Sequence, residues 1–365
     1  MELATRGASP TGSGILAGIA FTGCDLRAPV EASAAAGSAS GGGQPSARRR
    51  EVVVAGKRVK TVDVHAHCGV PEANKLLGVP FQGVLHMADT TTRIAAMDAQ
   101  GIDVEALSIN PVWYQAPRDL AAEVIKIQNA KLAEIMASSD RFVCYATVAL
   151  QHPDLAAEQL QAAVKSQGFR GVSIGGSVEG QDLSDPKFHP FWAKAEELGV
   201  LVFMHPQGTR ELESGNRLKG NGLLTNTIGN PLETTIALSH LIFEGTLDRF
   251  PGLKICAAHG GGYLPSYAAR SDAVCRTFPD QVGPLPKKKP TEYLRQLYFD
   301  TIVFTPEALR HLVAETGVGQ IVMGTDYPYP WTSTSVDHIL STPGLSDADK
   351  VAMLGGTAAK LLGIK

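Results

Sequence analysis

Two histidines separated by one residue are the first feature of this sequence that could do chemistry. His65 and His67 end an alternating, β-branched run that starts at Thr61 and is typical of a strand. Side chains two apart in a strand share a face, so both imidazoles are expected to point the same way. Histidine nitrogen is a common transition-metal ligand, although a lone His-x-His pair also fits two packed or solvated histidines. The residues at the other strand ends must therefore show whether this pair binds a metal.

Three further candidate ligands each come directly after an apolar run that predicts a strand. In a parallel barrel the carboxyl ends of the strands open onto one face, so residues that follow the strands meet in space. Unrelated core or surface residues would have no reason to share this position. The sequence therefore predicts a metal pocket formed by His65, His67, His205, His259 and Asp326.

The elements that must position these residues alternate from Glu51 to the C-terminus. About eight strand–helix units predict one (β/α)₈ TIM barrel over residues 51–365. Long loops at 206–230 and 276–290 follow strands, where a barrel builds its active-site rim. Strands are predicted at 51–55, 57–65, 104–109, 142–148, 171–174, 200–204, 253–258, 297–300 and 320–323, and helices at 93–100, 120–138, 155–166, 188–198, 232–247, 306–315 and 347–362.

The helix predicted at 232–247 has the clearest start signal in the chain. Asn230 is expected to cap it, Pro231 suits its first turn and Glu233 complements its positive end. Asn110, directly after the strand at 104–109, is expected at the rim, where it either binds substrate or supports a turn.

The motifs around the predicted ligands resemble the amidohydrolase superfamily, in particular the group of aminocarboxymuconate semialdehyde decarboxylase. The resemblance covers the chain from about Val62 to its end and implies a metal-dependent barrel enzyme. It implies that one divalent ion, Zn²⁺ or alternatively Mn²⁺, is held by His65, His67, His205 and Asp326. The motifs that carry the resemblance are VHAH at 64–67, MHP at 204–206, AHGGG at 258–262 and GTDYP at 324–328.

The same resemblance implies roles for two residues outside the ligand set. His259 is the implied acid/base. Arg270 matches an arginine that contacts the substrate carboxylate of a neighbouring subunit, which implies a homodimer or a larger homo-oligomer.

Departures from the family pattern refine the prediction. The strand at 171–174 is followed by two glycines and lacks the bridging Lys or Glu of binuclear members, so a single ion is expected. His-x-His replaces the Glu-x-His of related hydroxybenzoate decarboxylases. No second substrate-binding arginine is evident between Cys68 and Arg93, and Gln207 replaces an aromatic residue, so the substrate stays open.

The chemistry of such a site allows two reactions. Three imidazoles and one carboxylate leave an ion open to water or substrate, as catalytic sites require, and the ion lowers the pKa of bound water. We expect a non-oxidative decarboxylase of a small unsaturated or aromatic carboxylic acid, with His259 or Asp326 returning the proton to the carbanion. A hydrolase or hydratase of a lactone or amide is the alternative, and a catalytically silent binding lipoprotein is a third possibility.

Composition excludes other classes. The chain has 365 residues, 44% of them hydrophobic and 19% charged, which suits one large barrel. A net charge of −3 argues against nucleic-acid binding, and the basic clusters 48–50 and 287–289 are expected to be solvated loops. The five cysteines form no C-x-x-C pair, so neither a disulfide framework nor a zinc knuckle is indicated.

Residues 1–50 differ from the rest and are expected to form a disordered or signal-like extension. Residues 32–47 are almost wholly Ala, Gly and Ser, a composition typical of flexible linkers. The apolar run that ends at Cys24 resembles a bacterial lipoprotein signal, although only Arg6 supplies its basic region. Two locations therefore stay open, the cytoplasm, or export with a lipid anchor at Cys24.

Overall fold

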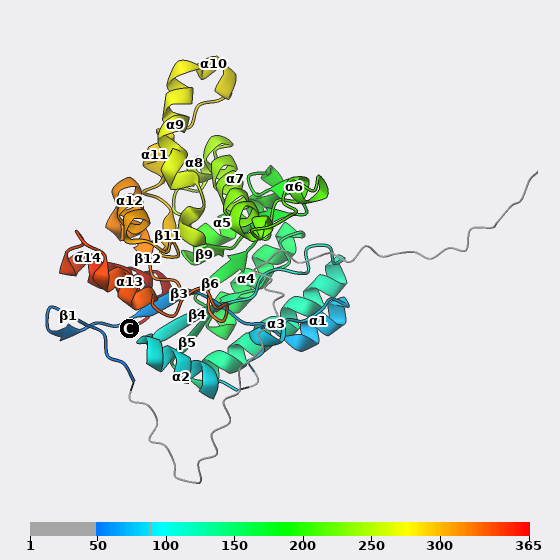
Figure 1. Cartoon of the computed structure of the whole chain (residues 1–365). Coiled ribbons are helices and arrows are strands. Elements are labelled where there is room, and N and C mark those ends of the chain that lie inside the picture. The colour runs from blue at the N-terminus through cyan, green and yellow to red at the C-terminus, as the bar shows by residue number, and fades with distance from the viewer. Residues whose placement is uncertain (1–48, 88) are drawn as a thin grey trace, which may run out of the picture.

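The computed structural model describes residues 49–87 and 89–365 and contains one sheet of eight strands at its centre (Figure 1). All neighbouring strands of this sheet run parallel, and their spatial order follows the sequence. The strands are β3 (Val62–His67), β4 (Val104–Ser108), β5 (Phe142–Ala146), β6 (Gly171–Ile174), β9 (Leu201–Met204), β10 (Lys254–Ala257), β11 (Tyr298–Asp300) and β12 (Ile321–Val322).

The first and last strands of this sheet meet and close it. The Val64 N–H donates to the Met323 carbonyl at 2.9 Å, and the Asp326 N–H donates to the His65 carbonyl at 2.8 Å. The predicted (β/α)₈ barrel is confirmed.

Helices surround the sheet, as Figure 1 shows. Most predicted helices occur within a few residues of their expected bounds, and α9 carries α10 away from the body of the molecule. The helices are α1 (Pro71–Leu77), α2 (Thr91–Gln100), α3 (Arg118–Ser138), α4 (Pro153–Gln167), α5 (His189–Leu198), α6 (Arg210–Ser214), α7 (Asn230–Phe243), α8 (Thr246–Arg249), α9 (Leu264–Thr277), α10 (Pro279–Val282), α11 (Pro290–Tyr293), α12 (Pro306–Thr316), α13 (Ser335–Ser341), α14 (Asp347–Val351) and α15 (Thr357–Leu362).

Short elements complete the chain. The π-helical turns η3 (Thr225–Gly229) and η6 (Ala352–Gly356) lead into α7 and α15. The remaining elements are the 3₁₀ turns η1 (Gly83–Leu85), η2 (Pro186–Phe188), η4 (His259–Gly261) and η5 (Val318–Gln320) and the paired strands β1 (Val53–Val54) with β2 (Lys57–Arg58) and β7 (Ser177–Val178) with β8 (Gln181–Asp182).

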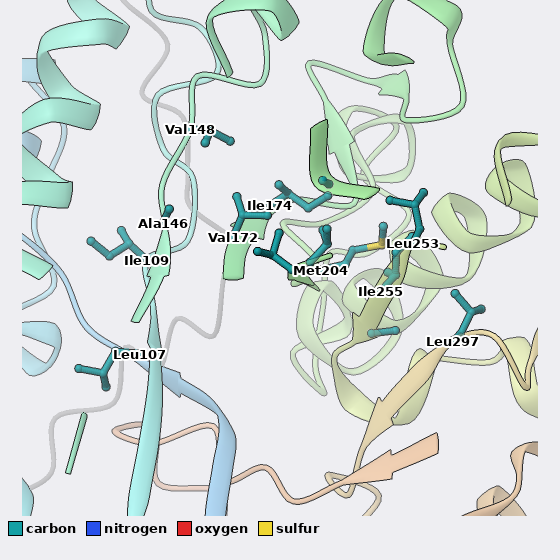
Figure 2. Packing of buried hydrophobic residues seen from close by; sticks show 14 of the residues in the cluster. Leu107, Ile109, Ala146, Val148, Val172, Ile174, Met204, Leu253, Ile255 and Leu297 are labelled. Carbon is teal, nitrogen blue, oxygen red and sulfur yellow. The ribbon is translucent and has the colours of Figure 1, made fainter. Parts of the chain in front are cut away.

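Two apolar layers hold the barrel rigid. Inside it, the Tyr145 ring stacks on Phe203 at 5.3 Å, and the Tyr145 hydroxyl donates to the Val64 carbonyl at 3.0 Å. A second, larger cluster joins aliphatic strand residues such as Leu107 and Ile174, labelled in Figure 2, with buried residues of the helices. Burial on both faces explains why the strands are apolar runs rather than strictly alternating ones. The residues that follow these strands are thereby fixed in space.

The start of the described chain corrects one expectation. Arg49 and Arg50, expected in a solvated loop, are half-buried and paired. Arg50 binds both carboxylate oxygens of Asp337, at 2.9 and 2.5 Å, and Arg49 pairs with Asp103. Their carboxylate partners come from the body of the barrel, so residues 49 and 50 pack onto it.

The predicted signal-like run, the Ala/Gly/Ser linker and Cys24 lie outside the described residues. Within residues 49–87 and 89–365, no helix combines the length and the apolar composition that crossing a membrane requires.

Candidate active site

An irregularity in β3 turns the first two histidines into the barrel. The pairing of β3 with β4 shifts register between Asp63 and Ala66. Val64 belongs to the interior cluster, and the ring of the next residue, His65, also contacts interior Phe203 at 4.9 Å. Adjacent residues of a regular strand face opposite ways, and a bulge is a usual means of re-aiming a side chain.

Four of the predicted residues converge in the structure. One ligand atom from each of His65, His67, His205 and Asp326 lies within 4.8 Å of the others, and all four side chains are buried. The two Nε2 atoms of His65 and His67 are 3.0 Å apart, and Asp326 Oδ1 lies 2.9 Å from His67 Nε2. Residues in or shortly after three separate strands, β3, β9 and β12, therefore meet in one place, as the sequence analysis expected.

The fifth predicted residue, His259, lies beside this cluster. Its Nε2 is 3.7 Å from Asp326 Oδ2, and its ring centre is 5.1 Å from that of His65. His259 and Asp326 have φ angles of +55° and +62°. Residues other than glycine rarely adopt this left-handed backbone conformation, and such backbone strain is concentrated at functional sites.

Two outer partners that the sequence analysis missed orient the imidazoles. Asp300 Oδ2 lies 2.7 Å from His65 Nδ1, and Ser108 Oγ lies 2.9 Å from His67 Nδ1. Each contact leaves the Nε2 atom of its histidine facing the cluster, an arrangement typical of metal ligands. The available signal was that Asp300 ends the strand predicted at 297–300.

Burial and charge set the protonation of the cluster. Burial lowers the pKa of His67 to about 4, despite its hydrogen bond to Asp326. Burial also opposes charge on His65, but the carboxylates of Asp326 and Asp300 outweigh it and raise the pKa of His65 to about 10. The His65 ring therefore lies between two buried carboxylates, 2.7 Å from Asp300 and 3.2 Å from Asp326, and negative charge at such a place favours a cation.

His205 provides the test of whether these residues fit a metal ion. It is fully buried, and among the described residues neither of its ring nitrogens has a hydrogen-bond partner. Burial, reinforced by the imidazoles of His67 and His65, holds the pKa of His205 well below its usual range. A neutral imidazole with an unshared nitrogen lone pair beside a carboxylate is a metal-ligand environment, so the donor set fits.

A pocket of about 410 Å³ opens beside the cluster. Such a volume lies within the range of small-molecule sites. None of the side chains described in its lining is a lysine or an arginine. Its lining includes His259, Asp326, Asn230, Tyr263, Phe304 and Trp331.

The two predicted substrate-binding residues lie elsewhere. Arg270 is exposed on α9 and does not line this pocket. Asn110 is half-buried beside Tyr329 in a separate small pocket of about 50 Å³, and its Oδ1 has no hydrogen-bond partner among the described residues. The structure therefore places neither residue against His259 of its own chain.

Asn230 corrects another expectation. The predicted N-cap has helical φ and ψ angles of −62° and −52°, because η3 continues directly into α7. It is therefore a residue of the helix, and its side chain lines the pocket. Sequence reasoning identified the residue but assigned it the wrong role.

Comparison with known proteins identifies the family. The amidohydrolase family model matches residues 62–364, nearly all of the barrel. The chain belongs to the amidohydrolase family. The resemblance that rested on four short motifs is thereby confirmed over the whole domain.

The chain is similar to several curated and solved members of this family. It is 29% identical over 309 residues to 2-amino-3-carboxymuconate-6-semialdehyde decarboxylase of Dictyostelium discoideum, covering 83% of this chain and 85% of that protein. It is 31% identical over 288 residues to gamma-resorcylate decarboxylase of a Rhizobium species, covering 74% and 86%. The manganese-containing dihydroxybenzoic acid decarboxylase of Polaromonas superposes with a TM-score of 0.73 at 27% identity, covering 84% and 97%.

These relatives agree in reaction class. The expectation of an amidohydrolase-family enzyme that is a metal-dependent decarboxylase is confirmed. A divalent ion is supported both by the four-residue cluster and by the manganese in the Polaromonas structure.

Proposed function

We propose that this chain catalyses the non-oxidative decarboxylation of a small aromatic or unsaturated carboxylic acid at one divalent metal ion. The observation that carries the proposal is the buried cluster of three histidines and one carboxylate, with His259 next to it, at the edge of a pocket of about 410 Å³. The substrates in the names of the curated relatives support the choice of a small carboxylic acid.

The ion would be held by His65, His67, His205 and Asp326, since their ligand atoms converge and no other side chain in the described part of the chain pairs with the His205 nitrogens. When bound, a divalent cation supplies Lewis-acid stabilisation of negative charge on the substrate. Three imidazoles and one carboxylate suit Zn²⁺, which is our first choice, and Mn²⁺ is the second because a relative holds it.

His259 is the proposed proton donor. After the carbon–carbon bond breaks, the electron pair left on the substrate must accept a proton. His259 lines the pocket, is partly solvent-accessible, and faces Asp326 Oδ2 at 3.7 Å. It can therefore receive a proton from water and deliver it to a bound molecule. Asp326 contacts both this imidazole and its fellow ligand His67, so it would hold His259 in place and share the proton.

The substrate carboxylate needs a partner that this pocket does not supply among its described side chains. Arg270, exposed on the projecting helix α9, is the proposed partner, reaching the pocket of a second copy of the chain (Figure 1). The active form would then be a homodimer or larger. Asn110 is the proposed contact for a substrate edge that extends toward Tyr329.

The proposed reaction is tested with the purified full chain. Elemental analysis should find about one Zn or Mn per chain, and incubation with a panel of aromatic acids that includes gamma-resorcylate should release CO₂. A matched panel of lactones and amides tests the alternative, a metal-dependent hydrolase or hydratase. Hydrolysis of that panel without CO₂ from any acid would disprove the decarboxylase assignment.

The shared site is tested by mixing two inactive variants. Arg270→Ala and His259→Ala should each be inactive alone. Random co-assembly of the two into dimers should restore about a quarter of wild-type activity, because half of the dimers contain one intact site. No recovery after confirmed co-assembly would show that Arg270 does not act across an interface.

A further inference from the structure

Asn230 is a buried polar side chain to which no other described residue offers a hydrogen-bond partner. It is 1% exposed, and among the described residues neither its Nδ2 nor its Oδ1 has a hydrogen-bond partner. Buried polar groups are normally paired, so an amide left without any partner needs an explanation. Asn230 also lines the pocket that holds His259 and Asp326.

A second buried asparagine in the same barrel, Asn129, has the hydrogen bonds expected of a structural residue. Asn129 is similarly buried, at 5% exposure, but both polar atoms of its side chain are paired with Thr147. Its Oδ1 accepts from the Thr147 N–H at 2.9 Å and from Oγ1 at 3.0 Å, and its Nδ2 donates to the Thr147 carbonyl at 3.0 Å. Asn230 makes no equivalent contact within residues 49–87 and 89–365, so a structural bridge between two described segments does not explain its burial.

The backbone holds Asn230 beside the proposed proton donor. Gly262, with φ +65°, follows the His259 turn, and a Cβ atom there would overlap the Pro231 carbonyl oxygen. The loop that carries His259 therefore packs directly on the first turn of α7. The π-helical turn η3, a conformation often found at functional sites, leads into this turn. Asn230 is thus rigidly placed rather than on a mobile loop.

We propose that Asn230 is a specificity-determining residue that hydrogen-bonds a neutral polar substituent of the substrate, such as a ring hydroxyl. This inference rests on the proposed function. An amide offers a donor and an acceptor, and a hydroxyl group can both accept from Nδ2 and donate to Oδ1. A second carboxylate would accept only and would leave Oδ1 facing an anion. The side chain therefore selects hydroxyl-bearing acids over dicarboxylates at this position.

The test uses two ligands that differ by one hydroxyl, 2-nitroresorcinol and 2-nitrophenol. The first is the inhibitor bound in the Polaromonas structure. Calorimetry with the metal-loaded wild type should show the dihydroxy ligand binding about 10- to 100-fold tighter. Asn230→Leu, which is similar in shape, should bring that ratio close to one and leave 2-nitrophenol binding nearly unchanged. Equal weakening of both ligands by Asn230→Leu, or a wild-type ratio near one, would overturn the proposal.

Thermal unfolding separates this role from a structural one. Asn230→Leu should unfold at or above the wild-type temperature, because it removes an unpaired buried amide, whereas Asn129→Leu should unfold at a lower temperature. A large loss of stability in Asn230→Leu would mean that the amide supports the fold and would count against the proposal. Failure of the decarboxylase assignment looks different, since wild type would release no CO₂ while the ligand ratio still reports on Asn230.

Discussion

Asp300 holds His65 through a 2.7 Å contact between its Oδ2 and the Nδ1 of the imidazole. The same oxygen accepts a 2.8 Å hydrogen bond from the backbone N–H of His259. One buried carboxylate thus fixes both a proposed metal ligand and the turn that carries the proposed proton donor. Burial opposes its charge, but the hydrogen bond and the charge of His65 outweigh that effect and lower the pKa of Asp300.

Replacing this carboxylate should weaken metal binding without removing a ligand. Asp300→Asn keeps the shape but loses the charge that orients His65, so metal affinity should fall about 10- to 100-fold. Competition against a chromogenic chelator measures the change. Asp154→Asn is the matched control, because Asp154 pairs with Arg118 on the surface. Equal affinities of Asp300→Asn and wild type would contradict the orienting role.

One pair of variants should distinguish a metal-ligand histidine, His65, from the proton-donor histidine, His259. His65→Ala removes a ligand and should lose metal and activity together. His259→Ala should retain about one metal ion per chain, while turnover falls about 10²- to 10⁴-fold because the proton donor is missing. Elemental analysis measures the metal content of each variant, and CO₂ release from the same preparations measures its turnover. Normal turnover by the His259 variant would refute its role.

Gly262 should tolerate no side chain. Its φ of +65° and the overlap of any Cβ with the Pro231 carbonyl oxygen predict that Gly262→Ala loses about 2 kcal/mol or more of unfolding free energy. Gly319→Ala is the control, because a Cβ there meets nothing within 4 Å. Chemical denaturation compares the two. A Gly262 variant as stable as the control would mean that the His259 turn adjusts freely.

Glu233 should make stability depend on pH. Its buried carboxyl accepts hydrogen bonds from the Gly208 N–H and from Ser177 Oγ, both at 2.8 Å. Burial outweighs them and raises the pKa of Glu233 from 4.5 to about 7. The folded protein therefore binds this proton more tightly than the unfolded chain does, and the unfolding free energy should fall as pH rises from about 4.5 to about 7.

The raised pKa of Glu233 sets the size of this effect. The unfolding free energy should fall by about 3 kcal/mol across that pH interval. Below it the group is protonated in both states and contributes nothing. Glu233→Gln cannot ionise, so its denaturation midpoints should lack this decline, whereas exposed Glu134→Gln should follow wild type. Parallel pH profiles for Glu233→Gln and wild type would show that Glu233 titrates normally.

The barrel and its cluster were predictable because each relevant residue follows an apolar run. That local pattern, repeated at His205, His259 and Asp326, needs only the parallel topology to become a site. Predicted bounds were less accurate where tertiary contacts intervene. The expected strand at 57–65 divides into β2, which pairs with β1, and β3, which joins the barrel.

What the sequence could not reveal are relationships between distant residues. Asp300 orients His65 from 235 positions away, and Arg50 binds Asp337 from 287 positions away. Asn230 has all the local features of a helix cap, and only the π-helical turn before it excludes that role. No pattern within a short window encodes such contacts.

The barrel closes between β3 and β12, and this closure affects how easily these two strands can separate. The proposed ion would be held by His65 from the first strand and by Asp326 from just beyond the last, whose backbone N–H already donates to the His65 carbonyl at 2.8 Å. Separation of these terminal strands would then require release of the ion. Amide hydrogen exchange at Val64 and Asp326 should slow on loading and so report occupancy directly.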